Sequence, residues 1–343
     1  VNPLRGQNNV QGACDMGALP NVYPGYQRVD DAEVRARFED AWEAPLPASA
    51  GLTVVEMMNA AAEGRLKALY IMGENPMLSD PDVGHVEEGL RRLELLIVQD
   101  IFLTETARLA HVVLPATSFA EKDGTFTNTE RRVQRVRRAV DAPGEARDDW
   151  RITCELARRM GRPMDYADGA SIMEEIARVT PIYGGISWSR IEREGIQWPC
   201  PTAEHPGTPY LHRERFTRGL GKFHAVEFIP ARELPDEEYP ILLSTGRMLE
   251  HFHTGTMSRR AEVLDWLVPE GAIEIHPEDA ARIGVCDGER VRVSSRRGRI
   301  EVRACVTDCV ARGGAFLVFH FGEAPANRLT IAALDPVAKI PEF

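Results

Sequence analysis

The sequence lacks the features that mark several common classes of protein. None of its six cysteines forms a C-x-x-C pair, so the patterns of a zinc ribbon and of a ferredoxin-type iron–sulfur site are absent. No apolar run approaches the roughly 18 residues of a membrane span. Basic residues are outnumbered, with 41 Lys and Arg against 52 Asp and Glu. The net charge of −11 argues against nucleic acid or an anionic membrane surface as a partner.

Common nucleotide and hydrolase motifs are missing as well. Neither G-x-G-x-x-G nor G-x-x-x-x-G-K-[ST] occurs, which disfavours a standard dinucleotide site or P-loop, and G-x-S-x-G and H-E-x-x-H are also absent. The scattered cysteines are typical of reduced thiols, so we expect a cytoplasmic location. The chain starts at Val1 without an initiator Met or a signal-peptide pattern, so we expect either processing or a fragment of a longer protein.

The length of 343 residues predicts two domains, preceded by an irregular segment. Residues 1–50 are punctuated by Gly and Pro, with one expected helix at 31–42, and irregular segments of this length are often functional. Residues 51–232 then alternate between the two element types. Helices are expected at 54–64, 83–93 and 104–110, and strands at 68–72, 95–98 and 112–114. This order predicts an α/β domain with a Rossmann-like, doubly wound parallel sheet.

A cluster of Pro and acidic residues at 230–238 predicts a domain boundary, and residues 233–343 are rich in strands. The expected strands are 241–245, 272–276, 289–295, 299–306 and 315–319. Turns at Asp287-Gly288 and Arg297-Gly298 separate three of them, which is typical of a small β-barrel.

Polar residues follow the first three expected strands. They are Gly73, Glu74 and Asn75, then Gln99 and Asp100, then Thr117 and Ser118. Because ligands of open parallel sheets bind beyond the carboxyl ends of the strands, these loops are predicted to contact a nucleotide base and ribose. The pattern alone leaves ordinary surface loops as the alternative.

Two further patterns invite a functional interpretation. His251 and His253 could ligate a metal, but without a nearby carboxylate hydrogen-bonding histidines are favoured, and we predict no metal held by this chain. The basic run 131–138 suggests nucleic-acid binding. The overall acidity instead favours a solvated or subunit-facing strand.

Longer motifs carry a specific resemblance. They include 1–17 (VNPLRGQNNVQGACDMG), 72–76 (MGENP), 98–102 (VQDIF), 114–118 (LPATS), 121–128 (EKDGTFTN), 197–200 (QWPC), 244–247 (STGR), 251–258 (HFHTGTMS) and 327–330 (NRLT). Together they cover essentially the whole chain. The sequence closely resembles the C-terminal half of the catalytic subunit of molybdenum- or tungsten-dependent formate dehydrogenases, in the molybdopterin oxidoreductase superfamily.

The resemblance implies two molybdopterin guanine dinucleotides with Mo or W, held by the Rossmann-like domain and by a C-terminal double-psi β-barrel at 233–343. It implies cofactor contacts for the loop residues above and for Asp149, Arg247, His251, His253 and Asn327. It also implies that Arg5 fixes the formate carboxylate and that Gln7 adds a donor, and a guanidinium suits that task because its planar fork matches a carboxylate. The metal ligand and a four-iron cluster are expected in an N-terminal half outside this sequence.

The implied activity is oxidation of formate to CO2, with two electrons passed to an iron–sulfur or diaphorase partner subunit. This chain alone is then expected to be inactive. Two alternatives stay open: a relative of nitrate reductases, and a non-catalytic scaffold like the large iron–sulfur subunit of respiratory complex I. The retention of Arg5, Gln7, Arg247 and His251 argues against the scaffold.

Overall fold

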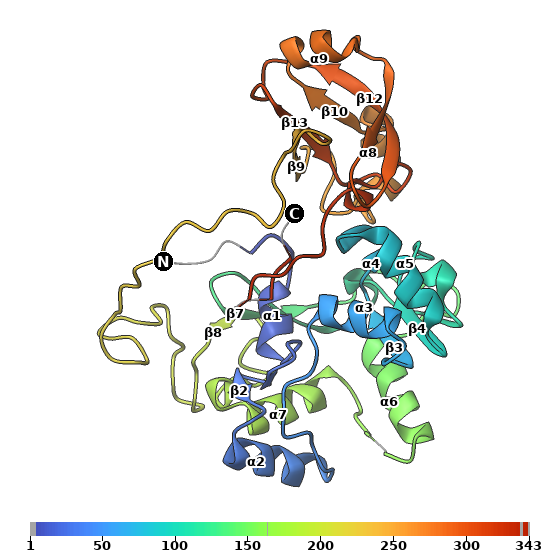
Figure 1. Cartoon of the computed structure of the whole chain (residues 1–343). Coiled ribbons are helices and arrows are strands. Elements are labelled where there is room, and N and C mark those ends of the chain that lie inside the picture. The colour runs from blue at the N-terminus through green and yellow to red at the C-terminus, as the bar shows by residue number, and fades with distance from the viewer. Residues whose placement is uncertain (1–4, 163, 337–338, 342–343) are drawn as a thin grey trace. The chain divides into compact units, whose positions relative to one another are not determined.

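The computed structural model describes residues 5–162, 164–336 and 339–341 and divides into two discontinuous units (Figure 1). Unit 1 combines Val1–Thr53 with Leu114–Val226, and unit 2 combines Val54–Val113 with Glu227–Phe343. The ranges predicted from the sequence, 1–50, 51–232 and 233–343, are continuous and divide the chain by fold type. They stay a prediction.

Unit 2 begins with the alternating helices and strands that the sequence predicts. The elements are α3 (Val54–Ala62), β3 (Ala68–Met72), α4 (Pro76–Ser79), α5 (Val83–Arg92), β4 (Leu95–Asp100), η1 (Ala107–Leu109) and β5 (Val112–Pro115). The sheet order is β3-β4-β5, and β3 and β4 are parallel. Apolar residues of α3, α5 and the two parallel strands, among them Met58, Leu90 and Leu96, form one buried cluster. The loops that follow β3 and β4 therefore start from a fixed core.

One expected element of this region differs in the structure. The helix predicted at 104–110 is reduced to the single 3₁₀ turn η1. A residue from outside this segment contributes, because Asn75 Oδ1 accepts from both the N–H and the hydroxyl of Thr106, while Thr104 Oγ1 accepts from the Ala107 N–H. Side chains that compete for backbone partners in this way shorten a helix.

The C-terminal part of unit 2 is a five-stranded mixed sheet. Its elements are β9 (Leu242–Gly246), η4 (Ser258–Arg260), α8 (Glu262–Leu267), β10 (Ala272–Ile275), α9 (Pro277–Ile283), β11 (Arg290–Ser294), β12 (Arg299–Val306), β13 (Gly314–Val318) and η5 (Ala326–Arg328). The order is β11-β12-β10-β13-β9, with β10 parallel to β12 and β9 parallel to β13. The α/β class is confirmed, with parallel and mixed sheets. Closure of this sheet into a double-psi barrel stays a prediction.

Asn327 links the two parts of unit 2. Its buried amide Nδ2 donates to the carbonyl of Leu78 at 2.9 Å and to that of Ser79 at 3.2 Å. Both carbonyls belong to α4, the helix that follows the loop 73–75. The residue thus braces the helix that follows the loop 73–75.

Unit 1 contains the N-terminal segment and a small antiparallel sheet. Its elements are α1 (Val10–Asp15), β1 (Val22–Tyr23), β2 (Gln27–Arg28), α2 (Ala32–Trp42), η2 (Phe119–Glu121), β6 (Gly124–Thr127), β7 (Arg132–Val136), α6 (Asp149–Arg159), α7 (Gly169–Val179), η3 (Pro181–Tyr183) and β8 (Ile196–Gln197). Strand β7 carries the basic run. Its Arg135 guanidinium lies 3.6 Å from the Trp188 ring centroid and pairs with Glu192 at 2.7 Å.

A buried carboxylate joins the N-terminal segment to the rest of unit 1. Asp15 is fully buried, and its Oδ1 accepts from Gln11 Nε2 and Tyr26 OH, each at 2.8 Å. Its Oδ2 accepts from Tyr183 OH at 2.6 Å and from Trp198 Nε1 at 2.7 Å. Burial, followed by the charge of Asp15, raises the pKa of both tyrosines above their ordinary range, so both hydroxyls stay donors.

Within the residues that the structure describes, no helix combines the length and the apolar character that crossing a membrane requires.

Asp15→Ala should reduce the free energy of unfolding by about 3–5 kcal/mol, because two hydroxyls and an indole N–H would lose their buried acceptor. Urea denaturation of the chain measures the loss. Asp30→Ala serves as control, since that carboxylate pairs with Arg28 at the surface and its removal should leave the curve unchanged. Equal curves for both variants would contradict the structural role of Asp15.

Candidate functional site

The loops after β3 and β4 lie against each other. The backbone N–H of Gly73 donates to the carbonyl of Gln99 at 2.9 Å. Asn75 is buried; its Nδ2 donates to Glu105 Oε2 at 2.8 Å, and its Oδ1 accepts from the N–H and the hydroxyl of Thr106. The structure therefore brings together the backbones of Gly73 and Gln99, while the side chain of Asn75 is held by Glu105 and Thr106 and the buried side chain of Gln99 accepts from the Tyr70 hydroxyl.

Carboxylates gather at this edge. Asp100 Oδ1 accepts from the N–H groups of Ile101 and Phe102, which orients that side chain. Loss of hydration, followed by the charges of Asp80 and Asp100, raises the pKa of Glu74. Burial raises the pKa of Asp80 to about 6, and its Oδ2 is buried without a hydrogen-bond partner among the described residues. The cluster is rich in acceptors, and the Arg260 guanidinium lies over the neighbouring Phe102 ring, 4.6 Å from its centroid.

The third predicted loop belongs to unit 1. Ala116 forms a parallel bridge with Arg147, and the Thr117 N–H donates to the Arg147 carbonyl at 3.1 Å. Ser118 caps η2 in a reciprocal arrangement with Glu121. Asp149, the first residue of α6, forms an ion pair with Lys122. Thr117, Ser118 and Asp149 thus form a second group of predicted cofactor residues.

The histidines of 251–253 belong to a third group, in which the sequence missed His320 and Ser258. His251 is buried; its Nε2 donates to the Val268 carbonyl at 2.8 Å, and its Nδ1 accepts from the Ser258 hydroxyl at 3.3 Å. His320 Nε2 accepts from the Met248 N–H at 2.9 Å, and its Nδ1 donates to the His253 carbonyl. Both rings are therefore held in place by hydrogen bonds from two sides.

The loop that these rings hold presents Arg247 and His253. Burial, followed by the positive charge of Arg247, lowers the pKa of His253. Arg247 is exposed, lies 5.7 Å from the Phe319 ring centroid, and has no carboxylate within ion-pair distance among the described residues. An anion could occupy this place.

Arg5 and Gln7 lie on the exposed N-terminal loop of unit 1. Asn9 anchors this loop, since its Oδ1 accepts from the Thr127 N–H at 2.9 Å. Gly12 makes room for that contact, because a Cβ there would lie 2.1 Å from Asn9 Oδ1. Helix α1 and the Asp15 cluster follow directly. The loop is therefore held at its base while the Arg5 and Gln7 side chains stay accessible.

Sequence patterns signal only some of the site residues that the prediction missed. His320 stands between two aromatic residues at the end of a strand, Phe319 and Phe321, which signals a buried position. Asp80 carries no such signal. Among the described residues no group of three or more His, Cys, Asp or Glu side chains is arranged to hold a metal ion.

Two family models match the chain. Residues 2–159 match the molybdopterin oxidoreductase model, and residues 241–343 match the molydopterin dinucleotide binding domain. The second match coincides with the five-stranded sheet of unit 2 and with the loop of His251 and His253.

Curated relatives align along the whole chain. The alpha subunit of F420-dependent formate dehydrogenase 2 of Methanococcus maripaludis is 54% identical over 100% of this chain and 51% of its own length. The corresponding subunit of Methanocaldococcus jannaschii is 53% identical, and formate dehydrogenase H of Escherichia coli is 41% identical. The chain spans about half the length of these relatives. Acetylene hydratase from Pelobacter acetylenicus has a similar fold, with a TM-score of 0.66 at 19% identity over 85% of this chain and 45% of that structure.

Replacing Asp80 by Asn should make stability less dependent on pH. The folded state holds the Asp80 proton more tightly than the unfolded chain does, so this group favours folding below pH about 4, and the benefit is lost as the pH rises through 6. Asp80→Asn should therefore gain about 1–3 kcal/mol over the parent chain between pH 4.5 and 7.5, measured by urea denaturation of the cofactor-free chain. The exposed Asp308→Asn is the control. A difference that is constant across this range would refute the assignment.

Proposed function

We propose, from the premise that this chain belongs to the molybdopterin oxidoreductase family, that it is the C-terminal, cofactor-binding part of a formate dehydrogenase catalytic subunit. The observation that carries the proposal is the identity of 51–54% over the whole chain with alpha subunits named as formate dehydrogenases. Because the chain spans half of those subunits, the activity is proposed for the complete subunit.

The proposed cofactor is a pair of molybdopterin guanine dinucleotides with Mo or W, which would supply a two-electron acceptor when bound. The carboxylates of Glu74 and Asp100 suit guanine, whose N1–H and N2–H groups are donors. The place where a Cβ of Gly73 would lie is open, with no heavy atom within 4 Å, so this edge has room for a ligand. Asn75 and Gln99 complete the edge.

The charge pattern of the two loops predicts which end of the dinucleotide lies at each of them. A pyrophosphate would be repelled by the carboxylates beyond β3 and β4 and attracted by Arg247. In this proposal Arg247 and His253 approach the phosphate or pterin part of one dinucleotide, while His251 and Asn327 act by fixing the loops around it. Thr117, Ser118 and Asp149 would receive polar groups of a nucleotide in unit 1.

Formate would bind at the N-terminal loop. The Arg5 guanidinium would hold both carboxylate oxygens, Gln7 would donate a further hydrogen bond, and the C–H bond would thereby be aimed at the acceptor. Oxidation converts formate into CO2, a proton and two electrons. The chain's own contribution is binding and orientation, because the metal ligand is proposed to lie in the remaining half.

The proposal includes partners and a location. The remaining half would supply an iron–sulfur cluster, and a separate subunit would receive the electrons. The name "subunit alpha" of the relatives supports a multi-subunit enzyme. The cysteines of the described residues are all unpaired, which fits the reducing conditions of the cytoplasm.

Replacing Asp100 and Asp149 together by Ala in the complete subunit should lower the pterin content more than about tenfold, because charge-assisted hydrogen bonds contribute roughly 1.5–3 kcal/mol each. Fluorescence of the oxidised pterin released per polypeptide measures this. Asp308→Ala, an exposed carboxylate elsewhere, should leave the content unchanged. Full occupancy in the double variant would remove both residues from the site.

Arg5→Lys in the complete, metal-loaded subunit should raise the KM for formate about tenfold or more, because Lys keeps the charge and loses the bidentate fork. The kcat should fall too, since the same contact orients the C–H bond. Steady-state kinetics with metal content determined in parallel test this. Unchanged kinetics would assign Arg5 a purely structural role in the loop.

A further inference from the structure

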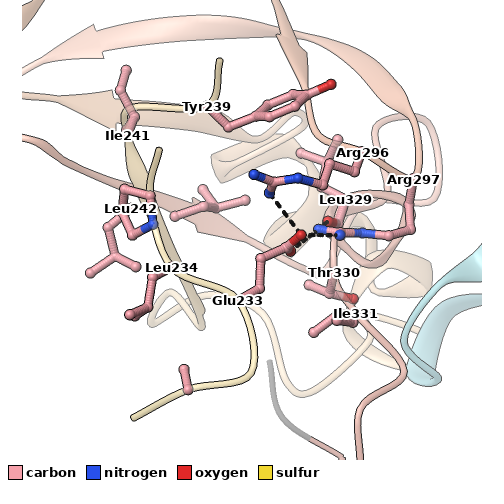
Figure 2. Close-up of a pocket in the computed structure, with 13 residues that line it drawn as sticks. Glu233, Leu234, Tyr239, Ile241, Leu242, Arg296, Arg297, Leu329, Thr330 and Ile331 are labelled. Carbon is pink, nitrogen blue, oxygen red and sulfur yellow. Dashed lines mark hydrogen bonds and ion pairs between the residues drawn. The ribbon is translucent and has the colours of Figure 1, made fainter. Parts of the chain in front are cut away.

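Two neighbouring arginines at the tip of one hairpin have different sets of contacts. Arg296 and Arg297 lie in the turn between β11 and β12, and both guanidiniums point toward Glu233 (Figure 2). Their Nη1 atoms each donate to Glu233 Oε1 at 2.7 Å, and Arg297 Nη2 lies 2.5 Å from Glu233 Oε2. Among the described residues, only Arg297 of the two also donates to the Leu329 carbonyl, at 3.0 Å. Arg297 therefore links the hairpin tip to the segment that follows η5.

The backbone of the same turn lies close to η5. The Ser295 N–H donates to the Gly298 carbonyl at 2.9 Å, which closes a tight two-residue turn. A Cβ at Gly298 would lie 3.0 Å from both Cγ and the carbonyl oxygen of Arg328, so a side chain there would force the turn or η5 to shift. The position of Arg297 relative to the segment after η5 is thus fixed by the backbone as well as by its guanidinium.

The segment after η5 is held on one side by polar contacts rather than by packing. Leu329, Thr330 and Ile331 line a cavity of about 160 Å³ that Glu233 also borders (Figure 2). Atoms that face a cavity lose packing contacts on that side. The Arg297 Nε is buried without a hydrogen-bond partner among the described residues, so little water reaches this guanidinium. Its bonds to Glu233 and Leu329 are therefore expected to be costly to remove.

The same segment makes the contact with α4. The Thr330 hydroxyl donates to the Asn327 carbonyl at 3.3 Å, which closes the segment on itself. The Asn327 amide in turn donates to the carbonyls of Leu78 and Ser79 in α4, the helix after the loop 73–75. All of these residues belong to unit 2. A series of contacts thus leads from the hairpin tip to the helix beside a predicted cofactor loop.

We propose that Arg297 is a positioning residue of the cofactor site. It fixes the Leu329 carbonyl, this keeps Asn327 within reach of α4, and α4 sets the position of the loop 73–75. The inference rests on the proposed function, because it takes that loop as a contact of the nucleotide. Supporting contacts of this kind matter because a binding loop that lies even about 1 Å from its productive geometry binds weakly.

Hydrogen exchange of the chain alone tests the coupling without cofactor. The amides of residues 78–80 donate within the turn of α4. In Arg297→Met they should exchange about tenfold faster than in the parent chain. Arg296→Met is the matched control, because that arginine shares the hairpin tip and Glu233 but does not donate to Leu329, and it should leave these amides unchanged. Equal acceleration in both variants, or none in Arg297→Met, would overturn the proposal.

A double-mutant cycle separates this route from a general loss of stability. Asn327→Ala removes the contact with α4, so Arg297→Met should change the exchange of residues 78–80 by less than about twofold in that background. The full tenfold effect in the Asn327→Ala background would refute the route through Asn327. Arg297→Lys keeps the charge beside Glu233 and serves if the Met variant does not fold. It should accelerate exchange by about threefold, and parent-like exchange would contradict the proposal.

The pterin content of the complete subunit distinguishes this inference from the proposed function. Arg297→Met should lower the pterin released per polypeptide about threefold or more, and Arg296→Met should leave it unchanged. A parent subunit without pterin, together with the expected exchange in the chain alone, would refute the proposed function and leave the coupling to α4 intact. A parent subunit with pterin and an Arg297→Met subunit that retains all of it would refute the positioning role.

Discussion

The buried carboxylate of Asp15 is the contact on which unit 1 depends. Its two oxygens receive four hydrogen bonds from residues as far apart as Gln11 and Trp198, so one charge fixes a segment that contains little regular structure. A buried charge is costly unless every lone pair is satisfied, and here neutral donors satisfy it without a cation in hydrogen-bond contact. The loop with Arg5 can therefore stay accessible while its base is rigid, which is the combination that a small anionic substrate requires.

In unit 2, too, one set of residues holds the loops in place and another set is exposed on them. Amide and imidazole side chains brace the loops: Asn75 and Asn327 hold the loop beside α4, and His251 and His320 hold the loop of Arg247. Charged groups stay at the surface of the braced loops. The carboxylates and the arginines of the braced loops, Arg247 and the Arg260 that lies over the Phe102 ring, therefore contribute most to the potential at these loops.

Helices and strands that depend on short-range sequence patterns were predicted well. The strand 68–72 is found as predicted, and the predicted helices near 54 and 83 differ by only a few residues at their ends, because period and capping residues act locally. The prediction of a helix at 104–110 was wrong, because Asn75, which lies 31 residues earlier in the chain, accepts a hydrogen bond from the Thr106 hydroxyl. The loops beyond β3 and β4 could be predicted from topology. The roles of Asp15, Asp80 and His320 could not, because each depends on partners that only the tertiary fold brings together.

The contact between Asn327 and α4 has a consequence for biosynthesis. It joins residues 249 positions apart, so the helix after the loop 73–75 gains this contact only after 249 further residues have been made. At roughly 5–20 residues per second, a ribosome takes about 12–50 s to cover that distance. During this interval the nascent β3-β4 region carries its predicted nucleotide-facing loop without its final brace. The loop therefore gains this brace only after Asn327 has been made.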